Sequence, residues 1–528
     1  MNPDSPYRTV RQPLYASNVV ATSQPLAAQA GLRMLIAGGN AVDAALATAI
    51  ALTVVEPTSN GIGSDAFAIV WDGESLHGLN ASGRSPAGWT EDRFAHLETM
   101  PIRGWDSVTV PGAVSAWKVL SQRFGRLPFE QLFEPAIEYA RHGYPVSPIV
   151  ARSWKQAAHT LSDQPGFAEA FMPNHSAPVA GQVFRLPAMA DSLVQIADTG
   201  GESFYRGELA SRIVACSDQK GGAISLDDLS NHRPDWCGTV SLSWHGYDLH
   251  EIPPNGQGIA ALIALGILRE VAGFDELDPD SPQSIHVQIE AMKLAFADLH
   301  RYVSDPATME ISPEALLDRE YLRSRAGLID PRKARAPIHG VPSRTGTVYL
   351  TAADSGGRMV SLIQSNYMGF GSGIVVPGTG ISLQNRGSGF RSKPGHPNSV
   401  GPSKRPFHTI IPGFVMRNGK PIMSFGVMGG PMQAQGHVQM AVRVLMHCQN
   451  PQMASDAPRW QVMDAGYIAV EEGMTDSVVT DLGKMGHDVR VLPGTTNQSF
   501  GGAQLIMKTD SGFVAGSDHR KDGMAVGF

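Results

Sequence analysis

The segment Thr345-Gly346-Thr347-Val348-Tyr349-Leu350-Thr351 separates a mainly helical part of this 528-residue chain from a part rich in short strands. A threonine becomes a nucleophile when the peptide bond before it is cut, because the freed α-amine then lies beside the hydroxyl as a base. The pKa of an α-amine is roughly 7.7–8.0, so part of it is neutral at physiological pH. Gly-Thr is a common pair, and on this segment alone a threonine that simply opens a β-strand is the simpler interpretation.

Periodic apolar residues and turn residues predict helices and strands on both sides of this segment. The expected helices lie over 25–36, 41–55, 282–302 and 433–448, with Ser23 as the cap of the first. The expected strands lie over 66–71, 348–353, 359–364, 380–383, 409–416 and 421–425. Residues 331–346 have the composition of an exposed linker. Strands on both sides of a linker, with helices around them, predict an α+β fold built as a layered sandwich.

Composition narrows the class of protein. The formal charge of −7, with 17% charged residues, offers no basic surface for nucleic acid. The three cysteines, Cys216, Cys237 and Cys448, form no Cys-x-x-Cys pair, which argues against a disulfide scaffold or a zinc site. The first residues lack the basic and apolar regions of a secretory signal, and the apolar run 44–55 is too short to cross a bilayer. We therefore expect a cytoplasmic protein without nucleic-acid or membrane partners.

Two further segments after Thr347 could take part in catalysis. Gln364-Ser365-Asn366 follows one hairpin later, so an amide side chain there could hold the nucleophile's hydroxyl or a substrate carbonyl. A satisfied Asn at a strand end is an equal alternative. Gly429 and Gly430 lie between a predicted strand and a predicted helix, where their N–H groups could form an oxyanion hole, although a tight turn explains them as well.

Other catalytic signatures are absent from the sequence. It contains no Gly-x-Ser-x-Gly, no His-Glu-x-x-His and no phosphate-binding Gly-x-x-x-x-Gly-Lys-Ser/Thr motif. His286 and Glu290 stand four residues apart on a predicted helix and could be metal ligands, but an ordinary polar pair is favoured. We expect neither a metal nor another cofactor.

Many ordered motifs resemble the γ-glutamyltransferase family of N-terminal-nucleophile hydrolases over nearly the full chain. The motifs that carry the resemblance lie at 38–45, 54–57, 61–63, 110–114, 290–298, 304–306, 370–375, 404–406, 429–430 and 516–520. The resemblance implies a four-layer αββα sandwich and a proenzyme that cuts itself between Gly346 and Thr347. A large subunit, residues 1–346, and a small subunit, residues 347–528, would then stay together as a heterodimer or as a dimer of heterodimers.

The same resemblance assigns roles to single residues. Thr347 would attack an amide carbonyl, with its own α-amine as base. Gly429 and Gly430 would stabilise the oxyanion, and Asn366 matches the family's Asn near the nucleophile. Water or an amine would resolve the acyl-enzyme.

The chain departs from the family where a γ-glutamyl substrate is bound. The family's carboxylate-binding Arg is missing from the 80–86 loop, with Arg84 two residues from its place. The family's Gln and Asp that hold an α-amine become Arg386 and Gly389, and its Ser-Ser pair becomes His408-Thr409. A site that has lost an anion and gained a cation suits a substrate carboxylate and disfavours an ammonium. Arg386 could equally be a structural residue.

These departures favour a self-processing amidohydrolase of a small anionic acyl amide. Two branches of the family fit this description: the cephalosporin-acylase-like members, whose substrates carry a glutaryl side chain, and the oxamate amidohydrolases, which release ammonia from a very short oxo-acid amide. The predicted substrate-binding residues are Arg386, Arg84, Gln364, His408 and Thr409. One alternative is a γ-glutamyl hydrolase or transferase acting on glutathione-like substrates. The other is an unprocessed, non-catalytic scaffold protein, against which Gly346-Thr347, Asn366 and Gly429-Gly430 argue together.

Overall fold

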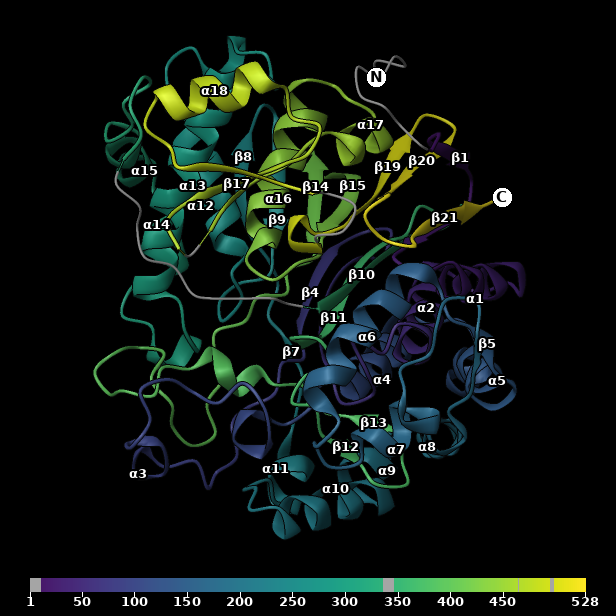
Figure 1. Ribbon diagram of the computed structural model, residues 1–528. Coiled ribbons are helices and arrows are strands. Elements are labelled where there is room, and N and C mark those ends of the chain that lie inside the picture. Colours follow the sequence, from purple (N-terminus) through teal and green to yellow (C-terminus); the bar gives the residue numbers. More distant parts are fainter. Residues whose placement is uncertain (1–10, 336–345, 464, 494–497) are drawn as a thin grey trace.

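The computed structural model describes residues 11–335, 346–463, 465–493 and 498–528, which contain two large seven-stranded sheets (Figure 1). The β10 sheet has the order β21 (Met524–Gly527), β2 (Val19–Thr22), β10 (Gly346–Ala353), β11 (Met359–Tyr367), β3 (Asp65–Trp71), β4 (Leu76–Asn80) and β7 (Asp235–Trp236). The β15 sheet has the order β1 (Leu14–Ala16), β20 (Gly512–Ser517), β19 (Ala503–Thr509), β15 (Lys420–Val427), β14 (Gly413–Arg417), β9 (Tyr247–Glu251) and β8 (Val240–Trp244). Both sheets join strands from before and after the Gly346–Thr347 step.

Strand alternation places the apolar side chains of β10 in two different cores. In β10, Val348, Leu350 and Ala352 pack with helices, whereas Tyr349 and Ala353 belong to a core between the two sheets. This separation follows from the two-residue period of a strand, whose successive side chains point to opposite faces.

Helices cover the face of each sheet that is turned away from the other sheet (Figure 1). The helices that pack with the β10 sheet include α1 (Pro25–Ile36), α2 (Ala41–Val55), α4 (Ala113–Phe124), α5 (Glu134–His142) and α8 (Pro187–Asp198). Those that pack with the β15 sheet include α12 (Gly258–Arg269), α13 (Pro282–Tyr302) and α16 (Met432–Ala441). The fold is therefore of the α+β class.

Most predicted elements are present, and the differences have local causes. The helices over 25–36, 41–55 and 282–302 are confirmed. The cap of α1 is Gln24 rather than Ser23: Gln24 Oε1 accepts from the N–H groups of Leu26 at 2.6 Å and Ala27 at 3.1 Å. The hydroxyl of Ser23 instead donates to Glu56 at 2.6 Å, because its side chain points into the buried interior.

The elements after Thr347 differ mainly at their ends. The strand predicted over 409–416 begins only at Gly413, since residues 408–411 form hydrogen bonds to side chains and loops. The helix predicted over 433–448 ends as α16 at Ala441 and continues as a π-helical turn, Val442–Met446. Within the predicted linker, residues 331–335 are at least partly exposed, and residues 336–345 lie outside the described residues. Within the described part of the chain, every helix is too short or too polar to cross a membrane.

Candidate active site

Thr347 is the second residue of β10 and lies at an irregularity in its pairing with β11. Gly346 pairs with Tyr367 and Val348 with Gln364, so the register shifts across Thr347. Such bulges redirect a side chain and are frequent beside active sites. The Thr347 hydroxyl lies 3.2 Å from that of Ser365, and the side chain is almost fully buried. The predicted placement of the 364–366 segment on the neighbouring strand is confirmed.

Contacts between the two sheets align β10 with β15. The hydroxyls of Thr351 and Ser424 lie 2.5 Å apart. The ring of Tyr349 occupies the space above Gly426, where an added Cβ would lie 2.4 Å from the ring. The two strands therefore run in opposite directions at this contact: Thr351 lies against Ser424, and Tyr349, two residues earlier in β10, lies against Gly426, two residues later in β15.

The turn between β15 and α16 contains Gly429 and Gly430. β15 ends at Val427, directly before this turn, and the N–H of Met428 donates to the Gly502 carbonyl at 2.9 Å. Gly429 and Gly430 have φ values of 114° and 60°, a region that glycine adopts readily. Gln257 Nε2 donates to the Gly430 carbonyl at 2.7 Å and fixes the turn. Backbone N–H groups at this point can stabilise a developing oxyanion.

Asn366 follows Ser365 on β11, but its side chain is held by Ser64, directly before β3, and by Ser382 of β13 (Ile381–Ser382). Its Oδ1 accepts from the Ser64 hydroxyl at 2.8 Å, and its Nδ2 donates to Ser382 Oγ at 3.1 Å. Among the described residues, the hydroxyl of Thr347 has Ser365 and not Asn366 as its hydrogen-bond partner. The two hydrogen bonds of Asn366 therefore fix the end of β11 next to Thr347.

The carboxamide of Gln364 is also turned toward the helices. Its Nε2 donates to the Ala49 carbonyl at 2.8 Å and to Asn60 Oδ1 at 2.6 Å, and its Oε1 accepts from Trp117 Nε1 at 3.1 Å. All three contacts are buried, which leaves both amide hydrogens and the oxygen engaged. The prediction of Gln364 as a substrate contact gains no support from this placement.

Arg386 is buried next to the strand that pairs with β10. Its Nη1 donates to the Thr409 hydroxyl at 2.8 Å, and its guanidinium carbon lies 4.6 Å from the ring centre of Tyr367. The Tyr367 backbone pairs with Gly346, and its φ of 77° is strained for a residue other than glycine. Nε and Nη2 of Arg386 are buried without a hydrogen-bond partner in the described part of the chain. Burial lowers the pKa of Arg386 to about 10, which leaves it cationic at neutral pH.

Asp65 and His408 form a buried pair, and the charge of Arg386 affects the pKa of both. His408 Nε2 lies 3.2 Å from Asp65 Oδ2, while Asp65 Oδ1 accepts from the N–H groups of Gly83 at 3.2 Å and Gly112 at 3.1 Å. Burial raises the pKa of Asp65 to about 7, and the positive charge of Arg386 opposes that shift. Burial, with Arg386 nearby, holds the pKa of His408 well below its usual range, so His408 is neutral.

Arg84 points away from this group. Its Nη1 donates to Asp305 at 3.1 Å and to the Ser403 carbonyl at 3.2 Å, and 46% of its side chain is exposed. The structure thus brings Arg386, His408 and Thr409 together and places Arg84 at the surface.

His286 and Glu290, on α13, form a separate buried cluster with His487. His286 Nδ1 lies 2.8 Å from His487 Nε2, and His286 Nε2 lies 2.8 Å from the Asp330 carbonyl. Lys293 Nζ donates to Glu290 at 2.8 Å. The nitrogens of His286 are engaged and an ammonium lies among the candidate ligand atoms, so the group fits a hydrogen-bonded polar cluster better than a cation site.

Comparison with known proteins identifies the family. The gamma-glutamyltranspeptidase family model matches residues 27–528. The chain belongs to the γ-glutamyltranspeptidase family. The crystal structure of a cephalosporin acylase from Bacillus halodurans is 47% identical, with a TM-score of 0.94, and the match covers 100% of this chain and 99% of that chain.

Two relatives in the γ-glutamyltranspeptidase family carry names that describe proenzymes. The glutathione hydrolase-like YwrD proenzyme of Bacillus subtilis is 38% identical over 96% of this chain and 98% of its own. The oxamate amidohydrolase proenzyme of Klebsiella pneumoniae is 34% identical over 95% of this chain and 97% of its own. These similarities support an amide-bond hydrolase.

Three residues of this γ-glutamyltranspeptidase-family site were not among those predicted from the sequence. Asp65, Ser365 and Tyr367 contact or face predicted site residues. Strand alternation could have indicated Ser365, because Gln364 and Asn366 both face away from the neighbouring sheet. The roles of Asp65 and Tyr367 depend on which loops meet them, and no local pattern contains that information.

Proposed function

We propose that this protein is an autoprocessing amidohydrolase that cleaves a small amide whose acyl part carries a carboxylate. The observation that carries the proposal is Arg386, a buried cation with two N–H-bearing nitrogens, Nε and Nη2, that lack partners among the described residues. Buried charged donors normally have partners, since burying them unpaired is costly. A substrate carboxylate would provide a charge-assisted and bidentate partner.

The proposed nucleophile is Thr347 after cleavage of the Gly346–Thr347 bond. The backbone of Tyr367 pairs with Gly346 and its ring lies against Arg386, so Tyr367 connects Arg386 to the residue before the proposed nucleophile. In the reaction, the Thr347 hydroxyl oxygen forms an ester with the acyl carbon while its proton passes to the α-amine. The amine returns the proton to the leaving nitrogen, and water then hydrolyses the ester. N–H groups of Gly429 and Gly430 would stabilise the tetrahedral oxyanion in both steps.

The proposed precursor yields subunits 1–346 and 347–528, associated as a heterodimer or a dimer of heterodimers. Both sheets contain strands from each subunit, which supports continued association after cleavage. The proposal includes the four-layer αββα arrangement of N-terminal-nucleophile hydrolases and a cytoplasmic location. The names of the relatives support proenzyme processing in this family.

Oxamate-type and glutaryl-type amides are the favoured substrates, since each has a carboxylate and lacks an α-ammonium. Glutathione-like γ-glutamyl substrates are the second candidate, favoured by the name of the Bacillus subtilis relative. An α-ammonium would have to lie near Arg386, with the neighbouring Asp65 already engaged by three donors. This arrangement weighs against a γ-glutamyl group.

Intact mass measurement followed by an amide panel tests the proposal. We expect two fragments that separate before Thr347, and turnover of oxamate or glutaryl-p-nitroanilide in preference to γ-glutamyl-p-nitroanilide. Faster turnover of the γ-glutamyl amide would favour the second candidate. A single 56.4 kDa chain inert on all three amides would contradict the proposed function and favour a non-catalytic scaffold.

A further inference from the structure

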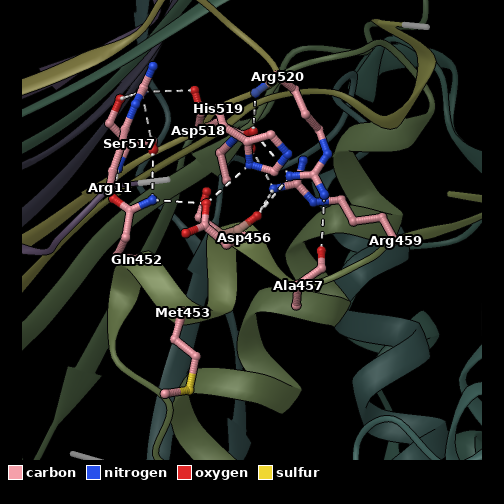
Figure 2. Close-up of polar contacts among 12 residues, drawn as sticks. Arg11, Gln452, Met453, Asp456, Ala457, Arg459, Ser517, Asp518, His519 and Arg520 are labelled. Atoms are coloured by element: carbon pink, nitrogen blue, oxygen red, sulfur yellow. Dashed lines mark hydrogen bonds and ion pairs between the residues drawn. The ribbon is translucent and has the colours of Figure 1, made fainter. Parts of the chain in front are cut away.

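A buried ionic cluster lies outside the residues discussed so far. It consists of Arg459, Glu471, Asp518 and Arg520, each no more than 4% exposed. Figure 2 shows Arg459, Asp518 and Arg520 directed toward one another. Arg459 Nη2 donates to Asp518 Oδ2 at 2.5 Å, and Arg520 Nη1 donates to Asp518 Oδ1 at 3.1 Å. Arg520 also forms a two-point ion pair with Glu471.

Arg459 and Asp518 together hold both ends of the segment 500–503. Arg459 Nη1 donates to the Phe500 carbonyl at 2.9 Å. The N–H of Ala503 donates to Asp518 Oδ2 at 2.6 Å. The two side chains that hold the segment are also paired with each other, so its ends share one rigid support.

The middle of this segment packs against the turn that contains Gly429. The N–H of Met428 donates to the Gly502 carbonyl at 2.9 Å. An added Cβ on Gly501 would lie 2.0 Å from the Met428 carbonyl oxygen, and one on Gly429 would lie 3.0 Å from the Gly501 Cα. The backbones are thus in direct contact, and a displacement of Gly501 must displace Met428 or Gly429.

The ion pairs of this cluster fix the positions of the groups they bind more than they add to the free energy of unfolding. Two arginines hold the pKa of Asp518 far below its usual range, so the carboxylate stays ionised. A buried ion pair is weak evidence for a gain in stability, because desolvation offsets much of the attraction. Its directional contacts nonetheless hold bonded groups within narrow limits, and an oxyanion hole needs such limits.

We propose that Arg459 and Asp518 are positioning residues that set the backbone N–H groups of Gly429 and Gly430 through the segment 500–503. The inference rests on the proposed function for its catalytic consequence, although the mechanical coupling stands on the contacts alone. It assigns to the cluster a part in stabilising the oxyanion from outside the substrate pocket.

Arg459→Lys is the test variant and Arg520→Lys is its matched control. Lysine keeps the charge beside Asp518 but cannot also reach the Phe500 carbonyl, because its donors share one nitrogen. Arg520→Lys breaks the two-point pair with Glu471 and alters the bond to Asp518 Oδ1, whereas Arg520 makes no hydrogen bond to the segment 500–503 among the described residues. Both variants are first shown by circular dichroism to be folded at the assay temperature.

Two readouts follow for each variant. Hydrogen–deuterium exchange is measured on peptides that cover 426–433, with peptides from β3 as an internal reference. Both kcat and KM are measured on oxamate and on glutaryl-p-nitroanilide. For Arg459→Lys we expect at least fivefold faster exchange over 426–433 and about tenfold lower kcat with KM within twofold, as loss of part of an oxyanion hole predicts. For Arg520→Lys we expect both readouts to stay within threefold of the wild type.

Unchanged exchange over 426–433 in Arg459→Lys would overturn the proposal. Equal losses of kcat in the two variants would also overturn it, because the cluster would then act only through general stability. A wild type that hydrolyses neither amide would contradict the proposed function, and the exchange measurement would still decide the coupling.

Discussion

The carboxylate of Asp65 and the imidazole of His408 lie 3.2 Å apart, and both side chains are fully buried. The neutral His408 donates from Nε2, because its Nδ1 accepts from the Ile410 N–H at 3.3 Å. Asp65 makes no hydrogen bond to Arg386 among the described residues, but the two charges interact. The protonation state of Asp65 therefore changes the charge near Arg386.

Stability should depend on pH through Asp65. Burial raises its pKa to about 7 in the folded protein, compared with about 3.9 in an unfolded chain. Below pH 4 both states are protonated; between pH 4 and 7 the folded state binds more protons, so stability falls as pH rises. The full shift corresponds to about 4 kcal/mol. We expect the Tm of the wild type to fall relative to that of Asp65→Asn between pH 5 and 8. If the Tm of the wild type and that of Asp65→Asn changed in parallel with pH, Asp65 would keep the same charge from pH 5 to 8.

Arg386→Gln should weaken binding of anionic acyl groups selectively. A hydrogen bond to a charged group contributes about 1.5–3 kcal/mol, so KM for glutaryl-p-nitroanilide should rise about 10- to 100-fold. KM for the neutral butyryl-p-nitroanilide should change less than threefold. Comparable increases in KM for both amides would show that Arg386 does not bind the substrate carboxylate.

Replacement of Thr347 should separate processing from folding. Thr347→Ala lacks the hydroxyl that would attack the Gly346 carbonyl, so we expect one uncut, inactive chain on a denaturing gel. Thr347→Ser keeps a hydroxyl and should still yield two fragments. Two fragments of the expected sizes from Thr347→Ala would disprove self-cleavage by this residue.

Gln364→Ala should affect stability and spare substrate affinity. The change leaves the buried Trp117 Nε1 without its acceptor and the buried Asn60 Oδ1 without its donor from Gln364. An unsatisfied buried polar group costs about 1–3 kcal/mol, so the free energy of unfolding should fall by about 3 kcal/mol. Urea unfolding measures the loss, and KM of the folded variant should stay within twofold. A large rise in KM without loss of stability would restore Gln364 as a substrate contact.

Metal chelation should leave activity unchanged. The residues His286, Glu290 and His487 are bonded to one another, to Lys293 or to the backbone, and the nucleophile needs no metal to be activated. EDTA followed by buffer exchange should leave kcat within 20% of the starting value, roughly the error of such assays. Loss of activity that returns with added Zn²⁺ would contradict this expectation.

Much of the fold could be predicted from local patterns. The helices over 25–36, 41–55 and 282–302 have the predicted ends, because proline, capping residues and a following break mark them. The pairing of the 359–364 strand with β10 followed from its position one hairpin later. The cap of α1 was misassigned, because Ser23 and Gln24 both can accept a hydrogen bond and only the burial of Ser23 beside Glu56 selects between them.

The sequence by itself determined the family, the α+β class and the positions of Thr347, Gly429 and Arg386, since these depend on residue type and order. Only the tertiary structure decided which side chains face one another. It turned Gln364 toward the helices and Asn366 toward Ser382, brought Asp65 to His408 across 343 positions of sequence, and left Arg84 at the surface. These outcomes depend on how strands alternate and sheets pack, and a contact between distant residues has no signature in either local segment.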